Sequence, residues 1–264
     1  MPLESKNIFS KKESQSRLDF WPPDVQLIGK DILRVHATIW PAILTYLNVE
    51  WPKQIFVHGH ILSGGRKMSK TIGNVIGIDE MLNKFGTEAT RYLLMSAGTF
   101  GEDIDVTMER MIEKYNADLA NGLGNLTSRI LKLSSISLPT GQAGNFPAYR
   151  TGRQFLTRLP DGQVSNQNPI FNEQFSKKVN KLELDKALGY IWKIIRDEDK
   201  FIDKNEPWKL MKTDKKKFEE VMKKLLLDLA NIANLLVPFM PETSEKIKKA
   251  LKERKIKPLF QRIK

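Results

Sequence analysis

The sequence of 264 residues contains no cysteine and only three histidines. The absence of cysteine excludes disulfide bonds and thiolate metal sites. No apolar run approaches the roughly 18 residues that a membrane-spanning helix needs, and residues 1–15 lack the apolar centre of a secretory signal. These absences predict a cytoplasmic protein with no metal site and no membrane partner.

The composition is otherwise that of a globular protein, with 41% hydrophobic and 28% charged residues. The formal net charge is +12, and most of the excess lies C-terminal to Phe175. Such a charge favours an anionic partner, of which nucleic acid is the commonest. The alternative interpretation is a set of lysine-rich helix faces that are merely solvated.

The N-terminal half predicts one unit of a parallel α/β sheet. Residues 24–28 form a short apolar run, Gly29 follows, and residues 30–47 carry a helical pattern. The stretch "QIFVHGHIL" predicts a second strand that turns into a hairpin, and the glycine-rich "SGGRKMSKTIGNV" predicts a loop. Two short helices are expected at residues 78–84 and 87–97, separated by Gly86.

The C-terminal half predicts an antiparallel helix bundle. Helical periodicity covers residues 107–133, 171–203, 214–236 and 241–253. Between the first two segments, residues 134–170 are rich in Gly, Pro, Gln, Asn and Ser and predict a long loop or insertion.

Lys67 and Lys70 lie three residues apart in the glycine-rich loop, on either side of Met68 and Ser69. Two neighbouring ammonium groups suit an anion that binds between them, such as the phosphates of a nucleotide or a departing pyrophosphate. The spacing is not that of a P-loop. A solvated basic loop is the alternative.

Two further groups of residues combine chemistry with helical spacing. Ile32, His36 and Trp40 recur every four residues, with Asp31 in the first turn, so they would form one stripe on a helix. Alone, this pattern equally fits a stripe that faces the core, with an Asp that caps the helix.

Asn125 and Arg129 are four residues apart on a predicted helix, and Trp208 follows Pro207 after a later one. An amide and a guanidinium can read base edges, and an indole can stack on an unpaired base. The alternatives are a surface hydrogen-bonded pair and a tryptophan anchored in the core.

The motif "KMSKT" resembles the KMSKS signature of class I aminoacyl-tRNA synthetases. The blocks "FWPPDVQLIGKDILRVHATIWPAIL", "NADLANGLGNLTSR", "IDKNEPWKL" and "PFMPETSEKI" resemble methionyl-tRNA synthetases in the same order. The resemblance spans residues 19–263 and is weak only within the predicted loop.

The resemblance implies a mainly α chain. Residues 1–104 would be the C-terminal half of a Rossmann-like catalytic domain with the signature loop and a stem-contact region. Residues 105–264 would be an α-helical anticodon-binding domain. The implied activity is that of a methionine–tRNA ligase, with methionine, ATP with Mg²⁺, and tRNA(Met) as substrates.

The resemblance also implies roles for single residues. The catalytic residues would be Lys67, Lys70 and Asp31, and the methionine pocket would be formed by Ile32, His36 and Trp40. The anticodon would be read by Asn125, Arg129 and Trp208. ATP would be bound by Lys67, Met68, Ser69, Lys70, His58 and Gly59. Thr71 stands where the family more often has serine, and Gly73 and Asn74 are expected to shape the loop.

The family's His-Leu-Gly-His type signature, its connective insertion and the residue that fixes the methionine amino group are not found in this sequence. We therefore expect apolar surface to be exposed on the α/β part and no activity from this chain alone. Either a separate N-terminal synthetase chain complements it, or the chain is a truncated or mis-called gene product. The alternatives are a non-catalytic tRNA-binding fragment and another class I synthetase, for valine, leucine, isoleucine or cysteine.

Overall fold

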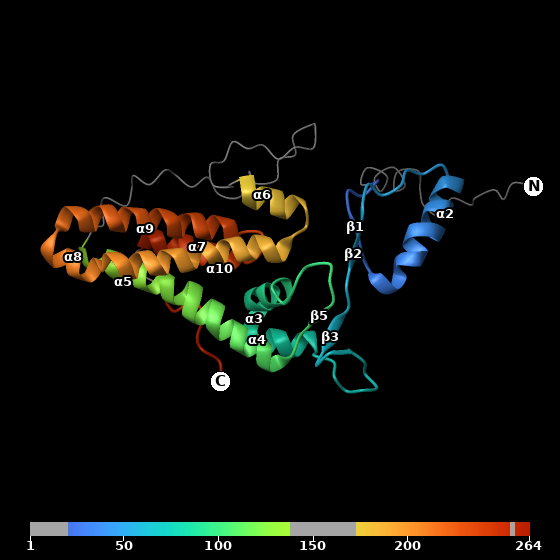
Figure 1. Ribbon diagram of the computed structural model, residues 1–264, viewed down its shortest axis with the longest axis horizontal. Helices are drawn as coiled ribbons and strands as arrows, with labels where there is room; N and C mark the ends of the chain where they lie inside the picture. The colour runs from blue at the N-terminus through green and yellow to red at the C-terminus, as the bar shows by residue number, and fades with distance from the viewer. Residues whose placement is uncertain (1–20, 138–172, 254–256) are drawn as a thin grey trace, which may run out of the picture.

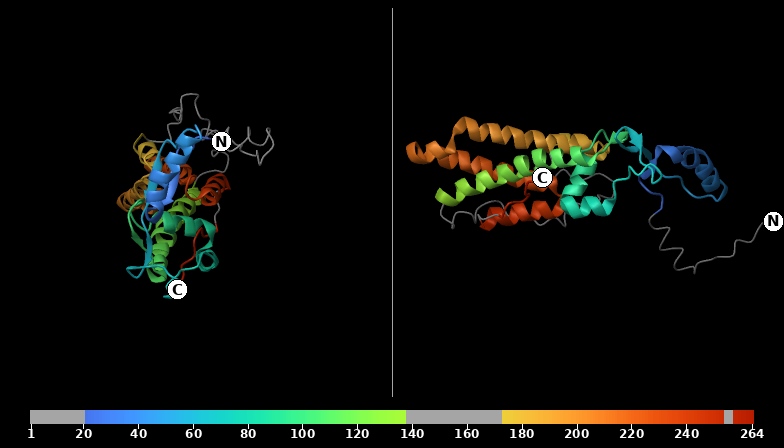
Figure 2. Two further views of the ribbon diagram at one scale, coloured as in Figure 1. Left: turned by 90° about the vertical axis from the view of Figure 1, so that its right-hand side faces the viewer. Right: turned by 90° about the horizontal axis from the view of Figure 1, so that it is seen from below.

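The computed structural model describes residues 21–137, 173–253 and 257–264. The molecule is elongated, with β1, β2 and α2 at one end and the long helices at the other (Figure 1). The views from the side and from below agree with this arrangement (Figure 2). Most of the predicted loop at residues 134–170 lies outside the described residues, but its first four residues belong to a helix that continues to Ser137.

The predicted parallel α/β unit is confirmed. Strand β1 (Gln26–Gly29) pairs in parallel with β2 (Ile55–His58), in a register that sets Gln26 opposite Ile55 and Gly29 opposite His58. Parallel strands need a crossover connection, and the helical residues between β1 and β2 provide it. The two carboxyl ends of the strands therefore meet at one edge.

The helical pattern predicted at residues 30–47 is confirmed, but the helix is irregular. A 3₁₀ turn (Lys30–Ile32) and a π-helical turn (Val35–Ile39) precede α2 (Trp40–Tyr46). Pro41 has no N–H to give to the preceding turn, and the N–H of Trp40 bonds to the carbonyl of Val35, five residues back. Such π turns occur frequently at functional sites.

A second, mixed sheet contains the signature motif. Strand β3 (Ile61–Ser63) pairs with β4 (Arg66–Lys67) in an antiparallel hairpin and with β5 (Ile104–Asp105) in parallel. Gly64 and Gly65 both have positive φ, as a tight two-residue turn requires. Lys67 is therefore a strand residue, and the prediction of an unbroken loop across it is wrong.

The predicted break at Gly86 is confirmed. Helix α3 (Ile78–Met95) is kinked there, with φ 76° and ψ 166° at Gly86. Helix α4 (Met108–Lys114), the π-helical segment η3 (Tyr115–Gly124) and α5 (Asn125–Ser137) then form one continuous rod, in agreement with the helical periodicity of residues 107–133.

The remaining helices form the bundle with α5. They are α6 (Glu173–Asn180), α7 (Leu184–Asn205), α8 (Pro207–Thr213), α9 (Lys215–Leu236) and α10 (Pro241–Glu253). The last two agree with the predictions. The single helix expected at residues 171–203 is wrong, because the chain turns through a left-handed Leu182 between α6 and α7. Helix α8 was not expected.

One buried apolar core extends from α3 to α10. It therefore includes residues on both sides of position 104, the predicted boundary between the two domains. It contains Met81, Leu93, Leu119, Ile191 and Leu229 among many others, all nearly inaccessible to solvent. By contrast, the large exposed apolar side chains of the described residues lie between Val25 and Leu82, apart from Trp208. The expected exposure of apolar surface on the α/β part is confirmed. No helix in the described part of the chain is long and apolar enough to cross a membrane.

Candidate functional site

The carboxyl ends of β1 and β2 bring the predicted site residues Asp31 and His58 together, on either side of Gly29. Gly29 pairs with His58 across the sheet. A Cβ atom on Gly29 would lie 2.8 Å from Oδ1 of Asp31 and 3.8 Å from Cε1 of His58. In open α/β sheets, ligands bind in the crevice outside the carboxyl ends of the strands. This edge is therefore the candidate nucleotide site.

Lys67 reaches this edge from the hairpin. Its Nζ atom lies 3.8 Å from Oδ2 of Asp31, and the two side chains are 63% and 56% exposed. An ion pair this exposed contributes little to stability. Its significance is positional, because it points a cation of the signature motif at the strand ends.

The second lysine of the motif is differently situated. Lys70 is exposed, and within residues 21–137, 173–253 and 257–264 no carboxylate or hydrogen-bond partner holds its amine. Within the described residues, the ammonium of Lys67 is therefore weakly paired and that of Lys70 is unpaired, so both charges are available to an anionic ligand.

Asn74 fixes the backbone between these lysines. Its Oδ1 accepts a hydrogen bond from the N–H of Ser69 at 2.8 Å, and its Nδ2 donates to the carbonyls of Lys67 and Ser63 at 3.3 and 3.4 Å. Gly73 has a φ of 73°, which side chains other than glycine rarely adopt. The expectation that these two residues shape the loop is confirmed.

Met68 and Ser69 have structural roles within the motif. Met68 is half-buried and packs against the main core. Ser69 gives its backbone N–H to Asn74, and its Oγ accepts from the N–H of Thr71 at 3.3 Å. Their predicted contact with ATP stays a prediction. In the structure Met68 anchors the loop to the core, and Ser69 holds the turn that follows it.

Gly59 has a packing reason that the sequence does not reveal. A Cβ atom there would lie only 2.2 to 2.4 Å from the backbone of Glu102 and Asp103. His58 Nδ1 lies 2.8 Å from the carbonyl of Gly59. The expected ATP contact of this pair stays a prediction, and close packing alone already requires glycine at position 59.

Asp103 ties this region together and was missed by sequence reasoning. Lys30 donates to both of its carboxylate oxygens, at 2.5 and 2.6 Å, and the N–H of His60 donates to Oδ1 at 2.7 Å. The hydrogen bond from Lys30 holds the pKa of Asp103 below its usual value. Lys30 and Asp103 are 73 residues apart, so only the fold reveals the contact.

The predicted methionine pocket is an open surface in this structure. Nδ1 of His36 lies 3.0 Å from the carbonyl of Ile32, which keeps the two neighbours. The ring of Trp40 meets Trp21 edge to face, with centroids 6.2 Å apart, and its buried Nε1 has no partner within the described residues. Ile32 is 42% exposed, so these residues present an apolar wall rather than a closed cavity.

Arg129 is held by two carboxylates of α7. It donates to Asp199 at 3.0 Å and to Asp203 at 2.6 Å. Burial raises the pKa of Asp199, and the charge of Arg129 opposes that rise. The side chain of Arg129 is 28% exposed, and its two ion pairs hold the guanidinium in place without a ligand.

Trp208 and Asn125 lie on neighbouring elements. Glu206, in a left-handed conformation, ends α7, and Trp208 follows at the start of α8. Helix α8 packs against α5. Trp208 is 41% exposed and Asn125 is exposed. The predicted amide and guanidinium therefore lie on α5 and the predicted indole lies on α8, which packs against α5. The amide and the indole are free to contact a ligand.

Comparison with known proteins follows the same two parts. Residues 4–131 match a family described as tRNA synthetases class I (M), and residues 168–260 match the anticodon binding domain of methionyl tRNA ligase. Methionine–tRNA ligase of Clostridium acetobutylicum is 38% identical over 88% of the chain, and that of Clostridium perfringens is 39% identical over 86%. The chain spans 35% and 34% of their lengths.

The fold is similar to that of a solved structure with a bound intermediate. Methionyl-tRNA synthetase of Mycobacterium tuberculosis in complex with methionyl-adenylate superposes with a TM-score of 0.71 and 29% identity. The superposition covers 91% of this chain and 46% of that one. The proteins compared are thus longer than this chain by a factor of two or more.

Proposed function

The chain belongs to the methionyl-tRNA synthetase family, and on that premise we propose that it supplies the signature loop and the tRNA-binding bundle of a methionine–tRNA ligase. The observation that carries the proposal is the approach of Lys67 to Asp31 at the carboxyl ends of β1 and β2. The relatives named above are all methionine–tRNA ligases, which favours methionine over valine, leucine, isoleucine or cysteine as the amino acid.

The substrates are methionine, ATP as its magnesium complex, and tRNA(Met). The methionine carboxylate attacks the α-phosphorus of ATP, the bond to the bridging oxygen breaks, and pyrophosphate leaves. Lys67 and Lys70 neutralise the charge that collects on the departing phosphates, which lowers the barrier more than it stabilises bound ATP. The tRNA hydroxyl then displaces AMP from the adenylate.

Asp31 and the apolar wall position the reactants. Asp31 holds Lys67 at the strand ends until a nucleotide displaces it. The thioether of methionine lies along Ile32, His36 and Trp40, because an uncharged, polarisable side chain suits an apolar, aromatic surface. His58 and Gly59 would line the adenosine side of the same edge.

At the other end of the molecule, Asn125, Arg129 and Trp208 read the CAU anticodon. The fixed guanidinium of Arg129 and the amide of Asn125 hydrogen-bond to base edges, and the exposed indole of Trp208 stacks on an unpaired base. The excess of lysines on the bundle attracts the phosphates of the anticodon stem.

A further α/β segment covers the exposed apolar face of the α/β part and completes the site. The support is the exposure of Leu27, Ile39 and Trp51, which are each more than half exposed. A parallel sheet is normally covered on both faces. The separate N-terminal chain expected from the sequence would fit this surface.

The test is methionine-dependent exchange of pyrophosphate into ATP. The chain is assayed alone and as a mixture with the N-terminal part of the Clostridium acetobutylicum relative, hereafter the mixed enzyme. We expect exchange by the mixed enzyme only. Exchange by the chain alone would contradict the need for a further segment. No exchange in either case, with selective binding of a CAU hairpin, would favour the tRNA-binding module.

A further inference from the structure

A hollow lies between residues 258–262 and the rod formed by η3 and α5. We call it the α5 hollow. Its volume is about 460 Å³, which is within the range of pockets that bind small ligands. It is lined by Ala120, Asn121, Gly124, Asn125, Ser128, Lys132, Pro258, Leu259, Phe260 and Arg262.

The hollow is positively charged. No acidic residue lines it, and Lys132 and Arg262 both do. Within the described residues neither cation pairs with a carboxylate. By contrast, Arg129 on the same helix, α5, pairs with two. Arg262 instead donates to the amide oxygen of Asn121 at 3.0 Å. The charge of the hollow is therefore available to an anion.

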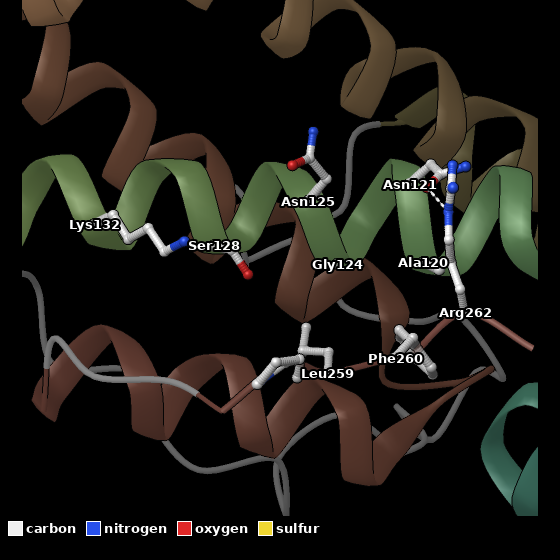
Figure 3. Close-up of a pocket in the computed structure, with 10 residues that line it drawn as sticks. Ala120, Asn121, Gly124, Asn125, Ser128, Lys132, Leu259, Phe260 and Arg262 are labelled. Atoms are coloured by element: carbon white, nitrogen blue, oxygen red, sulfur yellow. Dashed lines mark hydrogen bonds between the residues drawn. The ribbon is translucent and has the colours of Figure 1, made fainter.

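One wall is polar and the opposite wall is apolar. Figure 3 shows the polar ends of Lys132 and Ser128 close together on the helix, with Leu259 and Phe260 across from them. The apolar wall is held in place, because the ring of Phe260 meets Tyr115 edge to face at 6.0 Å. This arrangement fits a ligand with a flat apolar face and a negative group.

The apolar wall is also fixed through the backbone. Asn116 donates to the carbonyl of Ile263 at 2.8 Å and accepts from its N–H at 2.9 Å. Both the N–H and the carbonyl of Ile263 are thus held by η3, which fixes the segment that closes the hollow. A wall that is already ordered costs no further conformational entropy when a ligand binds.

Asn125 connects the hollow to the proposed anticodon site. It lies on the rim of the hollow and one helical turn from Arg129. We propose that the α5 hollow binds the nucleotide that flanks the CAU triplet, next to the base that Asn125 reads. The base lies against Leu259 and Phe260, and its phosphate lies between Lys132 and Ser128. This inference rests on the proposed anticodon recognition and extends it by one nucleotide.

The test uses an RNA hairpin with a CAU loop and fluorescence anisotropy with the whole chain. Lys132→Ala should weaken binding about tenfold, as loss of a charge-assisted contact implies, and lower the salt slope by about 0.7. The matched control is Lys223→Ala, which removes one charge from an exposed position on α9. Equal effects of the two variants would overturn the inference.

A second variant tests the hollow without a change of charge. Ser128→Phe fills the space at a half-exposed position, so the thermal unfolding midpoint should change little. We expect the wild type to bind the hairpin more weakly when an abasic residue stands next to the CAU triplet. Ser128→Phe already keeps the base out of the hollow, so the abasic residue should not weaken its binding further. If the abasic hairpin penalises both proteins equally, the hollow takes no base.

The two proposals fail in different ways. If the wild type does not prefer CAU over other loops, the proposed anticodon recognition is wrong. If that preference is present and Arg129→Ala removes it, while Lys132→Ala and Ser128→Phe bind like the wild type, only the inference about the hollow is wrong.

Discussion

The amide oxygen of Asn74 lies 2.8 Å from the backbone nitrogen of Ser69 and accepts its hydrogen bond. The same side chain donates to the carbonyl of Lys67, so one amide fixes both ends of the short segment that leads from the first lysine of the motif. The placement of the two lysines thus depends on a residue that carries no charge.

Asn74→Ala should lower pyrophosphate exchange by the mixed enzyme with little change in folding. Each lost hydrogen bond is worth about 1 kcal/mol, and these bonds order an exposed loop rather than the core. We expect exchange to fall about tenfold or more and the affinity for the CAU hairpin to be unchanged. Asn83→Ala, at an exposed position on α3, is the control. Unaltered exchange in Asn74→Ala would show that the loop needs no such clamp.

Replacing either lysine should affect catalysis more than binding. Lys67→Ala and Lys70→Ala each remove a cation that stabilises the transition state, so the exchange rate at saturating ATP should fall about 100-fold or more. Arg66→Ala is the matched control, because its side chain leaves the strand on the opposite face. A rise in KM with an unchanged maximal rate would instead mean that the lysines only hold ATP.

Arg129→Lys keeps the charge but loses the planar fork that contacts Asp199 and Asp203. The affinity for the CAU hairpin should fall about tenfold, with the salt slope unchanged because the charge remains. Arg196→Lys, an exposed change on α7, should have no such effect. Equal affinities of Arg129→Lys and wild type for the hairpin would show that RNA binding does not depend on the planar guanidinium of this residue.

Glu198 should make stability depend on pH. Burial raises its pKa above the usual value, despite the hydrogen bond from Lys224. The folded state therefore binds this proton more tightly than the unfolded state does, so its contribution to stability is present in acid and lost as pH rises through the folded-state pKa. In urea titrations, the stability of Glu198→Gln relative to wild type should increase between about pH 4 and pH 8.

The control for that experiment is Glu220→Gln, on the exposed face of α9. Its stability relative to wild type should stay level over the same pH range. A level difference for Glu198→Gln as well would mean that the buried carboxylate is fully compensated by Lys224.

The core and the uncovered sheet should respond differently to truncation. Leu123 is completely buried, so Leu123→Ala should lower the free energy of unfolding by about 2 to 5 kcal/mol. Leu27 is 55% exposed, and Leu27→Ala should change it by less than about 0.5 kcal/mol. In the mixed enzyme, Leu27→Ala should weaken association of the two parts. A large effect of Leu27→Ala on the chain alone would show that its face is already covered.

Sequence periodicity predicted the elements whose signals are local. The parallel pair β1 and β2, the break at Gly86, and the last two helices all follow from apolar patterns and from glycine and proline. The capping Asp214 that begins α9 is such a signal, since its side chain accepts from the N–H of Lys217. For the same reason the signature motif and the Asn125–Arg129 spacing were visible at once.

The features that the sequence did not reveal depend on contacts between distant residues or on unusual backbone conformations. Leu182 and Glu206 have positive φ, a conformation that neither residue type predicts. Leu182 separates α6 from α7, and Glu206 separates α7 from α8. The bond of Lys30 to Asp103 and the return of residues 258–262 onto α5 join segments far apart in the chain. No local pattern encodes such pairs.

The continuous core links the two parts of the proposed RNA-binding surface. Met68, beside the two lysines, and Leu210, on the helix that carries Trp208, pack against the same buried cluster. The segment that carries the two lysines and the helix that carries Trp208 therefore belong to one packed unit. Under the proposed function, an RNA that contacts both must match the distance between them. A short hairpin should then reach only one of them, whereas a full-length tRNA should reach both.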